Sequence, residues 1–113
     1  MGDDKSEVLQ GTLDLMVLKT LDVMGALHGY GIGQRIAQIS DDTLQINPGT
    51  VYLCLVRLQQ QKFIAARWGI SENNRRAKFY SVTAAGRRRL VAETAQWDRV
   101  ASVMGRILQQ RAR

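Results

Sequence analysis

The 113-residue chain has one cysteine, one proline and one histidine, and aromatic residues make up only 6% of it. A lone cysteine excludes an internal disulfide and fits a reducing compartment, so we expect a cytoplasmic protein. His28 and Cys54 lie far apart in the sequence, whereas a metal site needs about four ligands. We therefore expect no metal and no cofactor. Carboxylates do not cluster in a catalytic motif either, which argues against an enzyme.

Long apolar segments are also missing. Leu13–Leu18 and Val51–Leu55 are far shorter than the roughly 20 apolar residues that cross a bilayer, so we expect no membrane partner. The first residues, MGDDKSEV, contain no apolar segment typical of a secretory signal. Residues 29–33, GYGIG, do not follow a predicted strand and are not a dinucleotide-binding loop. We interpret His28 as a structural residue of this turn and Cys54 as a packing residue, with a thiol sensor as the alternative.

Positive charge is concentrated in the second half of the chain. Residues 1–56 carry a net charge of −4 and residues 57–113 carry +10, within the overall +6. This asymmetry predicts that one region faces a polyanion. A solvated basic face without a partner is the alternative. The run Arg87–Arg89 is open to the same two interpretations.

The first predicted helix spans Leu9–Met24. Its residues placed at 100° intervals give one broad apolar face, made of Leu13, Met16, Val17, Leu21, Val23 and Met24. Leu15 and Leu18 fall on the opposite, polar side and indicate a second partner surface, such as another subunit. Two isolated exposed leucines are the alternative. A short second helix is predicted from Tyr30 or Gly31 to Ser40.

Asn47 and Pro48 predict the start of a third helix that ends near Gln61. Asparagine is a good N-cap, and proline suits the first helical turn. The residues expected to face a core are Val51, Cys54, Leu55 and Leu58. Those expected to face outward are Thr50, Leu53, Arg57 and Gln60. This outward mixture of hydroxyl, apolar, guanidinium and amide groups suits base edges and phosphates.

Two short segments, 63–68 and 78–82, are rich in β-branched and aromatic residues and predict a β-hairpin. Its basic residues are Arg67, Arg75, Arg76 and Lys78. Thr83 then caps a long helix over about 84–108. A heptad-like seam follows this helix through Leu90, Thr94, Trp97, Ala101, Met104 and Leu108. We favour a dimerisation helix over one folded back on its own core.

Three helices followed by a basic hairpin is the order of a winged helix-turn-helix. We predict an α+β, mainly α fold with a winged helix-turn-helix DNA-binding domain in residues 1–83. Residues 84–113 form the predicted C-terminal dimerisation helix. A twofold dimer allows two third helices to meet two half-sites about one turn apart on a duplex.

Motifs along residues 8–108 carry a family resemblance. They are Gly11-Thr12-Leu13-Asp14, His28-Gly29-Tyr30, Asn47-Pro48-Gly49-Thr50 with Tyr52, and Lys78-Phe79-Tyr80 before Thr83 and Gly86. In these motifs the chain resembles the PadR family of bacterial transcriptional regulators. The resemblance implies a homodimeric repressor whose first and last helices form the dimer and whose third helix and wing bind DNA. It also implies a dimer cleft for a small aromatic effector, with Trp97 placed to line it; seam packing is the alternative for Trp97.

The chain departs from the family at Leu53, where a proline is usual, and at Val56, where a histidine is common, so the operator sequence does not transfer. The predicted DNA-binding residues are Asn47, Gly49, Thr50, Tyr52, Leu53, Arg57, Arg67, Arg75, Arg76 and Lys78. The predicted dimer residues are Leu15, Leu18, Leu90, Trp97, Ala101, Met104 and Leu108. The alternative function is a winged-helix interaction module that binds an acidic protein partner.

Overall fold

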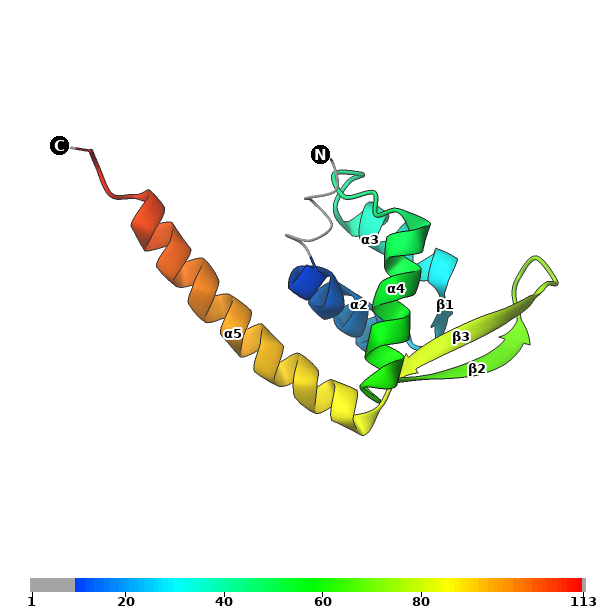
Figure 1. Cartoon of the computed structure of the whole chain (residues 1–113). Helices are drawn as coiled ribbons and strands as arrows, with labels where there is room; N and C mark the ends of the chain where they lie inside the picture. Colours follow the sequence, from blue (N-terminus) through cyan, green and yellow to red (C-terminus); the bar gives the residue numbers. More distant parts are fainter. Residues whose placement is uncertain (1–9, 113) are drawn as a thin grey trace.

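The computed structural model describes residues 10–112. Its elements are α2 (Gln10–Met24), β1 (Leu27–His28), α3 (Gly29–Ile39), α4 (Pro48–Gln60), β2 (Ile64–Ile70), β3 (Arg76–Val82) and α5 (Ala84–Leu108). Figure 1 shows α2, α3 and α4 gathered together, with the β2–β3 hairpin and α5 extending to opposite sides. The mainly helical α+β fold is confirmed. The segment MGDDKSEV and the predicted helix start at Leu9 lie outside the described residues.

Two helices begin at the predicted caps. The Asn47 side-chain oxygen accepts a hydrogen bond from the Gly49 N–H at 2.7 Å, directly before Pro48 at the start of α4. The Thr83 hydroxyl accepts one from the Gly86 N–H at 3.0 Å at the start of α5. Each bond satisfies one of the N–H groups that have no partner within the helix. The starts of α4 and α5 are therefore set by local chemistry that the sequence reveals.

The sheet has one more strand than the sequence indicated. β3 pairs antiparallel with β2 and also with β1, which gives the order β1-β3-β2. β1 has only two residues, too few for an alternating pattern to be recognised. Its last residue, His28, accepts the Gly31 N–H through Nδ1 at 3.1 Å and meets the ring of Phe79 edge-on at 5.5 Å. These contacts confirm that His28 has a structural role.

Helix α2 lies at the centre of the core and contacts α3, α4, β3 and α5. Leu13, Val17 and Leu21 are buried as predicted, but Leu18 is also buried, with 1% of its surface exposed. The prediction that Leu18 faces outward is wrong, because α2 is covered on several sides and not on one. Leu15, from the same predicted surface, is half-buried against the core.

The start of α5 packs onto α2, so Leu90 belongs to the protomer's own core, with 6% of its surface exposed. It is unavailable to a partner, contrary to its predicted place in the dimer seam. Gly86 allows the first turn of α5 to approach the backbone before β2, because a Cβ at that position would lie 2.0 Å from the carbonyl oxygen of Phe63. None of the helices in residues 10–112 is long and apolar enough to cross a membrane.

Candidate nucleic-acid interface

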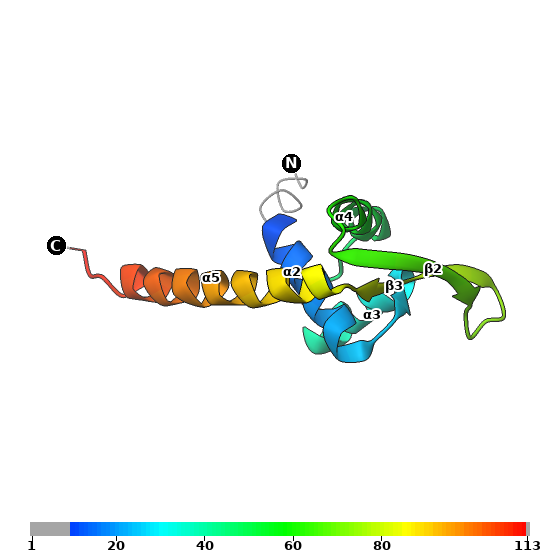
Figure 2. The ribbon, with the colours of Figure 1, turned by 90° about the horizontal axis from the view of Figure 1, so that it is seen from below.

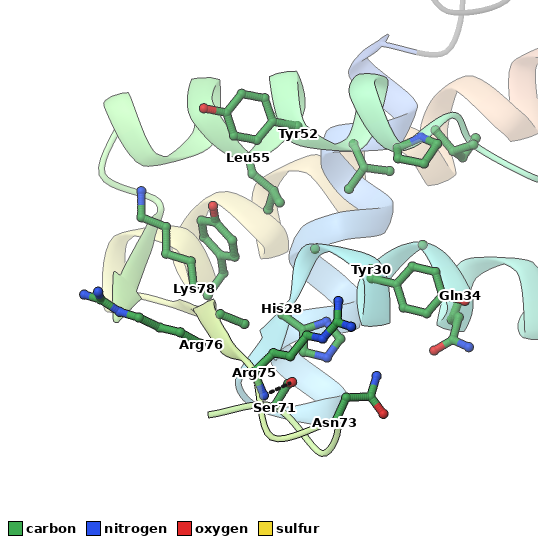
Figure 3. Close-up of a pocket in the computed structure, with 17 residues that line it drawn as sticks. His28, Tyr30, Gln34, Tyr52, Leu55, Ser71, Asn73, Arg75, Arg76 and Lys78 are labelled. Carbon is green, nitrogen blue, oxygen red and sulfur yellow. Dashed lines mark hydrogen bonds between the residues drawn. The ribbon is translucent and has the colours of Figure 1, made fainter. Parts of the chain in front are cut away.

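A groove of about 550 Å³ lies between α4, the start of α3 and the hairpin, which we call the wing. Its lining includes the core residues Val51, Leu55 and Tyr80, all of which are buried. Figure 3 shows Tyr52 on one side of this groove and the basic side chains of the wing on the other. We call this hollow the α4–wing groove.

The first turns of α4 form one side of the groove and are open to solvent. Asn47 and Gly49 are exposed, and Thr50 is partly exposed. Tyr52 and Leu53 are 58% and 63% exposed and add apolar surface to this end of the helix. The positive end of the helix dipole lies at the same place, while the Gly49 and Thr50 N–H groups already donate to Asn47. This end of α4 therefore offers both apolar and anion-binding contacts.

The wing supplies the opposite side of the groove. Arg75, Arg76 and Lys78 are exposed and line the groove. The tip is held by two hydrogen bonds, since the Ser71 N–H donates to the Arg75 carbonyl at 2.7 Å and the Arg75 N–H donates to the Ser71 hydroxyl at 3.3 Å. Asn74 completes the turn with a φ of 58°, a conformation that asparagine tolerates well. The three cations are thus presented on a short, defined hairpin.

The remaining predicted wing residue, Arg67, points away from this row of cations. It lies opposite Phe79 in the β2–β3 register, whereas Lys78 lies opposite Trp68. Neighbouring residues of a strand face opposite sides of the sheet. Arg67 is exposed, but on the other face of the wing. The structure therefore separates it from Arg76 and Lys78.

Sequence reasoning missed the contribution of α3 and the sheet to the groove. Tyr30 and Gln34 line it from α3, and Tyr30 is 72% exposed. Figure 3 shows both side chains close to the tip of the wing. In a helix-turn-helix the second helix lies next to the third. The residues at the start of the predicted second helix could therefore have been proposed as part of the interface.

Comparison with known proteins agrees with a nucleic-acid interface at the α4–wing groove. Residues 17–92 match the model of the transcriptional regulator PadR-like family. The chain belongs to the PadR-like family. It is thus a DNA-binding transcriptional regulator with a winged-helix fold and not an enzyme. An uncharacterised protein of Lysinibacillus sphaericus is 26% identical over 100 residues, which cover 88% of this chain and 91% of that protein.

Solved structures share the fold of this PadR-like chain. A transcriptional regulator from Clostridium thermocellum superposes with a TM-score of 0.82 at 24% identity, covering 91% of this chain and 99% of that one. A PadR-like regulator from Bacillus cereus gives 0.78 at 22% identity, covering 93% and 99%. A PadR family regulator from Eggerthella lenta gives 0.77 at 26% identity, covering 97% and 93%.

Arg57 of the PadR-like chain is not free to read DNA, and the prediction that it faces outward is wrong. Its Nη2 lies 2.5 Å from Oδ1 of Asp14 on α2, and its side chain is 31% exposed. The Cys54 thiol donates to the same oxygen at 3.0 Å. The Asp14 hydrogen bond raises the pKa of Arg57 above its ordinary value. The guanidinium therefore fixes α4 to α2.

Cys54 is fully buried, as predicted. Burial is the main cause that raises the pKa of its thiol above the ordinary value, and the hydrogen bond to Asp14 adds to this effect. Because the thiolate is the reactive form of cysteine, this thiol is held in its inert form. A packing role explains Cys54 better than a thiol sensor does.

Two of the three arginines at the start of α5 have partners within the protomer. Arg87 Nε lies 3.4 Å from Asp22 Oδ1, and Arg89 Nε lies 2.9 Å from Glu93 Oε2. Arg89 also lies over the ring of Phe63, 5.3 Å from its centroid. These contacts favour a local structural role for Arg87 and Arg89 over phosphate binding.

The distal part of α5 exposes the rest of the predicted seam. Trp97, Met104 and Leu108 are 49%, 49% and 75% exposed, and Ala101 is exposed between them. Val100 and Ile107 extend this apolar stripe along the helix. We call these residues the α5 stripe. Among residues 10–112, no other element packs against it closely enough to bury it.

Proposed function

We propose that the protein is a bacterial repressor that binds an operator as a homodimer, with α4 of each protomer in the major groove. The observation that carries this proposal is the α4–wing groove. Exposed Tyr52 of α4 and the cations Arg75, Arg76 and Lys78 line the same hollow. A helix fits the major groove, and a basic hairpin beside it reaches the neighbouring backbone. A protein that acts on chromosomal DNA in a bacterium works in the cytoplasm.

The exposed residues of α4 divide into two proposed roles. Thr50 and Leu53 read base edges, and Leu53 is suited to a thymine methyl group. Asn47, Gly49 and Tyr52 approach phosphate at the positive end of the helix dipole. Arg57 has no place in base reading, because Asp14 holds its guanidinium.

The wing supplies backbone contacts in this proposal. Arg75, Arg76 and Lys78 neutralise phosphates beside the bound helix, which makes binding salt-dependent. Arg67 lies on the other face of the wing. It therefore contributes to the general positive field and not to the same row of contacts.

The α5 stripe supplies the proposed dimer interface, together with the accessible part of Leu15. Of the predicted dimer residues, this interface keeps Trp97, Ala101, Met104 and Leu108, whereas Leu18 and Leu90 are buried in the protomer. Pairing of two stripes removes their apolar surface from water and sets the spacing of the two α4 helices. A small aromatic effector bound beside Trp97 would alter that spacing and release the operator.

The proposal is tested by fluorescence anisotropy with duplexes tiled across the upstream region of the protein's own gene. Scrambled duplexes and two salt concentrations serve as controls. We expect one tile to bind at least about 10³-fold more tightly than scrambled DNA. Equal, steeply salt-dependent binding to every duplex would contradict operator recognition. A module for an acidic protein partner would then explain the basic surface better.

A further inference from the structure

The face of the wing that covers the core continues outward beyond it. Residues directly opposite each other on two paired strands share one face of the sheet. From the core outward, the pairs on this face are Ala66 with Tyr80, Trp68 with Lys78, and Ile70 with Arg76. Tyr80 is buried and also lines the α4–wing groove. The outer two pairs therefore extend the groove side of the wing.

These outer pairs combine a cationic row with an apolar row. Lys78 and Arg76 lie on β3, and Trp68 and Ile70 lie on β2. Trp68 is 55% exposed and Ile70 is 64% exposed. The apolar row lies on the edge strand, because β2 has only β3 as a neighbour in the sheet. Two large apolar side chains thus stand on a surface that is otherwise basic.

The indole of Trp68 is already oriented by the cations beside it. The guanidinium carbon of Arg76 lies 4.4 Å from the ring centroid, and Nζ of Lys78 lies 5.8 Å from it. Both cations come from β3, on one side of Trp68. Cation–π attraction and a cross-strand pair stiffen a two-stranded hairpin. Despite these contacts, more than half of the Trp68 surface remains open to solvent on the edge strand.

We infer that Trp68 is a DNA-contacting residue of the wing. Its open side packs against deoxyribose and base edges in the minor groove, while Arg76 and Lys78 neutralise the adjacent phosphates. Ile70 extends the apolar contact toward the wing tip. Proteins that enter the minor groove commonly pair basic residues with an apolar side chain in this way. The inference rests on the proposed function and adds to it a contact that releases no counterions.

The two tryptophans of the chain, Trp68 and Trp97, make a direct test possible. In the variant Trp97→Phe, all tryptophan emission comes from Trp68, and in Trp68→Phe it comes from Trp97. Each variant is first checked for helix content and for duplex binding by anisotropy. On adding duplex DNA, we expect the acrylamide quenching constant of Trp68 to fall severalfold and that of Trp97 to stay constant. Unchanged quenching of Trp68 in a saturated complex would overturn the inference.

Salt dependence separates a contact from an indirect effect through Arg76. We expect Trp68→Ala to weaken duplex binding by about tenfold, within the range for aromatic contacts to nucleic acid, with an unchanged salt slope. Arg76→Ala should instead reduce the slope by about one. Trp68→Phe retains a ring and should recover part of the affinity that Trp68→Ala loses. If Trp68→Ala reduced the slope as Arg76→Ala does, Trp68 would only hold the arginine and the inference would be wrong.

DNA binding by the wild-type chain is measured first, so that a failure of the proposed function can be distinguished from a failure of the inference about Trp68. Absence of any duplex complex at low salt contradicts the proposed function and removes the basis of the inference with it. A wild-type complex that is insensitive to Trp68→Ala contradicts the inference alone.

Discussion

The wing and the distal part of α5 are both thin extensions, but their surfaces differ in chemistry. They project in opposite directions and account for the elongated shape of 61 × 31 × 23 Å, as Figures 1 and 2 show. The wing exposes Arg75, Arg76 and Lys78, whereas the α5 stripe exposes apolar residues such as Met104 and Leu108. The difference supports the proposed division of partners, with a polyanion for the wing and a second copy of the chain for α5.

Ion pairing supports this division. Within residues 10–112, the ion pairs use Arg57, Arg87 and Arg89, none of which belongs to the wing. The arginines near the core therefore hold the fold together, while the wing cations remain available to phosphate. Net charge alone did not distinguish these two groups.

The largest effect is expected from reversing charge on the wing. The double variant Arg75→Glu/Arg76→Glu should weaken duplex binding by about 10³-fold at low salt, because each chain exchanges phosphate contacts for repulsion. Anisotropy titrations measure this loss. The matched control, Arg99→Glu/Arg106→Glu, makes the same charge change on α5. A comparable loss in the control would show that net charge matters and the wing does not.

A charge within the α5 stripe should weaken the proposed dimer. Met104→Asp places a carboxylate in the proposed interface, where its desolvation is unfavourable. We expect dimer dissociation to become easier by about 100-fold, or roughly 2.7 kcal/mol. Sedimentation equilibrium measures the change. Ala95→Asp adds the same charge on the opposite side of α5 and should leave the dimer intact; a monomeric wild type would refute the interface.

Arg57 provides a sharper distinction between structural and DNA-binding cations. Arg57→Met removes the ion pair with Asp14 and should lower the free energy of unfolding by about 1–2 kcal/mol, since the pair is only partly buried. Denaturant titration measures this loss. The ratio of operator to scrambled affinity should stay near wild type, whereas Thr50→Ala should reduce it. A collapse of the ratio in Arg57→Met would restore Arg57 as a base-reading residue.

The smallest effect concerns the pH dependence of stability at the core between the two extensions. Burial raises the pKa of the Cys54 thiol in the folded protein, whereas an unfolded thiol titrates at about 8.5. The unfolded state loses this proton first, so stability is full below that pH and declines as pH rises above it. Denaturant titrations from pH 7 to 10 should show a shallower decline in Cys54→Ala. Identical slopes would contradict the role of burial.

The sequence predicted local structure well where one residue determines it. Asn47 with Pro48 and Thr83 marked the starts of α4 and α5, because capping depends only on neighbouring backbone groups. The inward face of α4 also followed from spacing. Leu18 was misplaced because a helical wheel assumes one covered side, and α2 is covered on several.

Interactions between distant segments were not predictable. Nothing in the spacing of α4 indicates that Asp14, 43 positions earlier in the chain, binds Arg57. The contact between Arg76 and Trp68 depends on the register of β2 and β3. The length of the turn fixes this register, but the sequence alone did not give the ends of the two strands. The sequence therefore located the DNA-facing elements but not all of the side chains they present.

The most direct test of the central claim is the mass of the complex with the preferred duplex, measured by native mass spectrometry. We expect two 12.7 kDa chains on one duplex. This complex should be lost both in Met104→Asp and in the wing double variant. In Met104→Asp the loss should be accompanied by free monomer, and in the wing variant by free dimer. A single chain bound specifically to the duplex, or loss of the dimer in both variants, would contradict the division of roles between wing and α5.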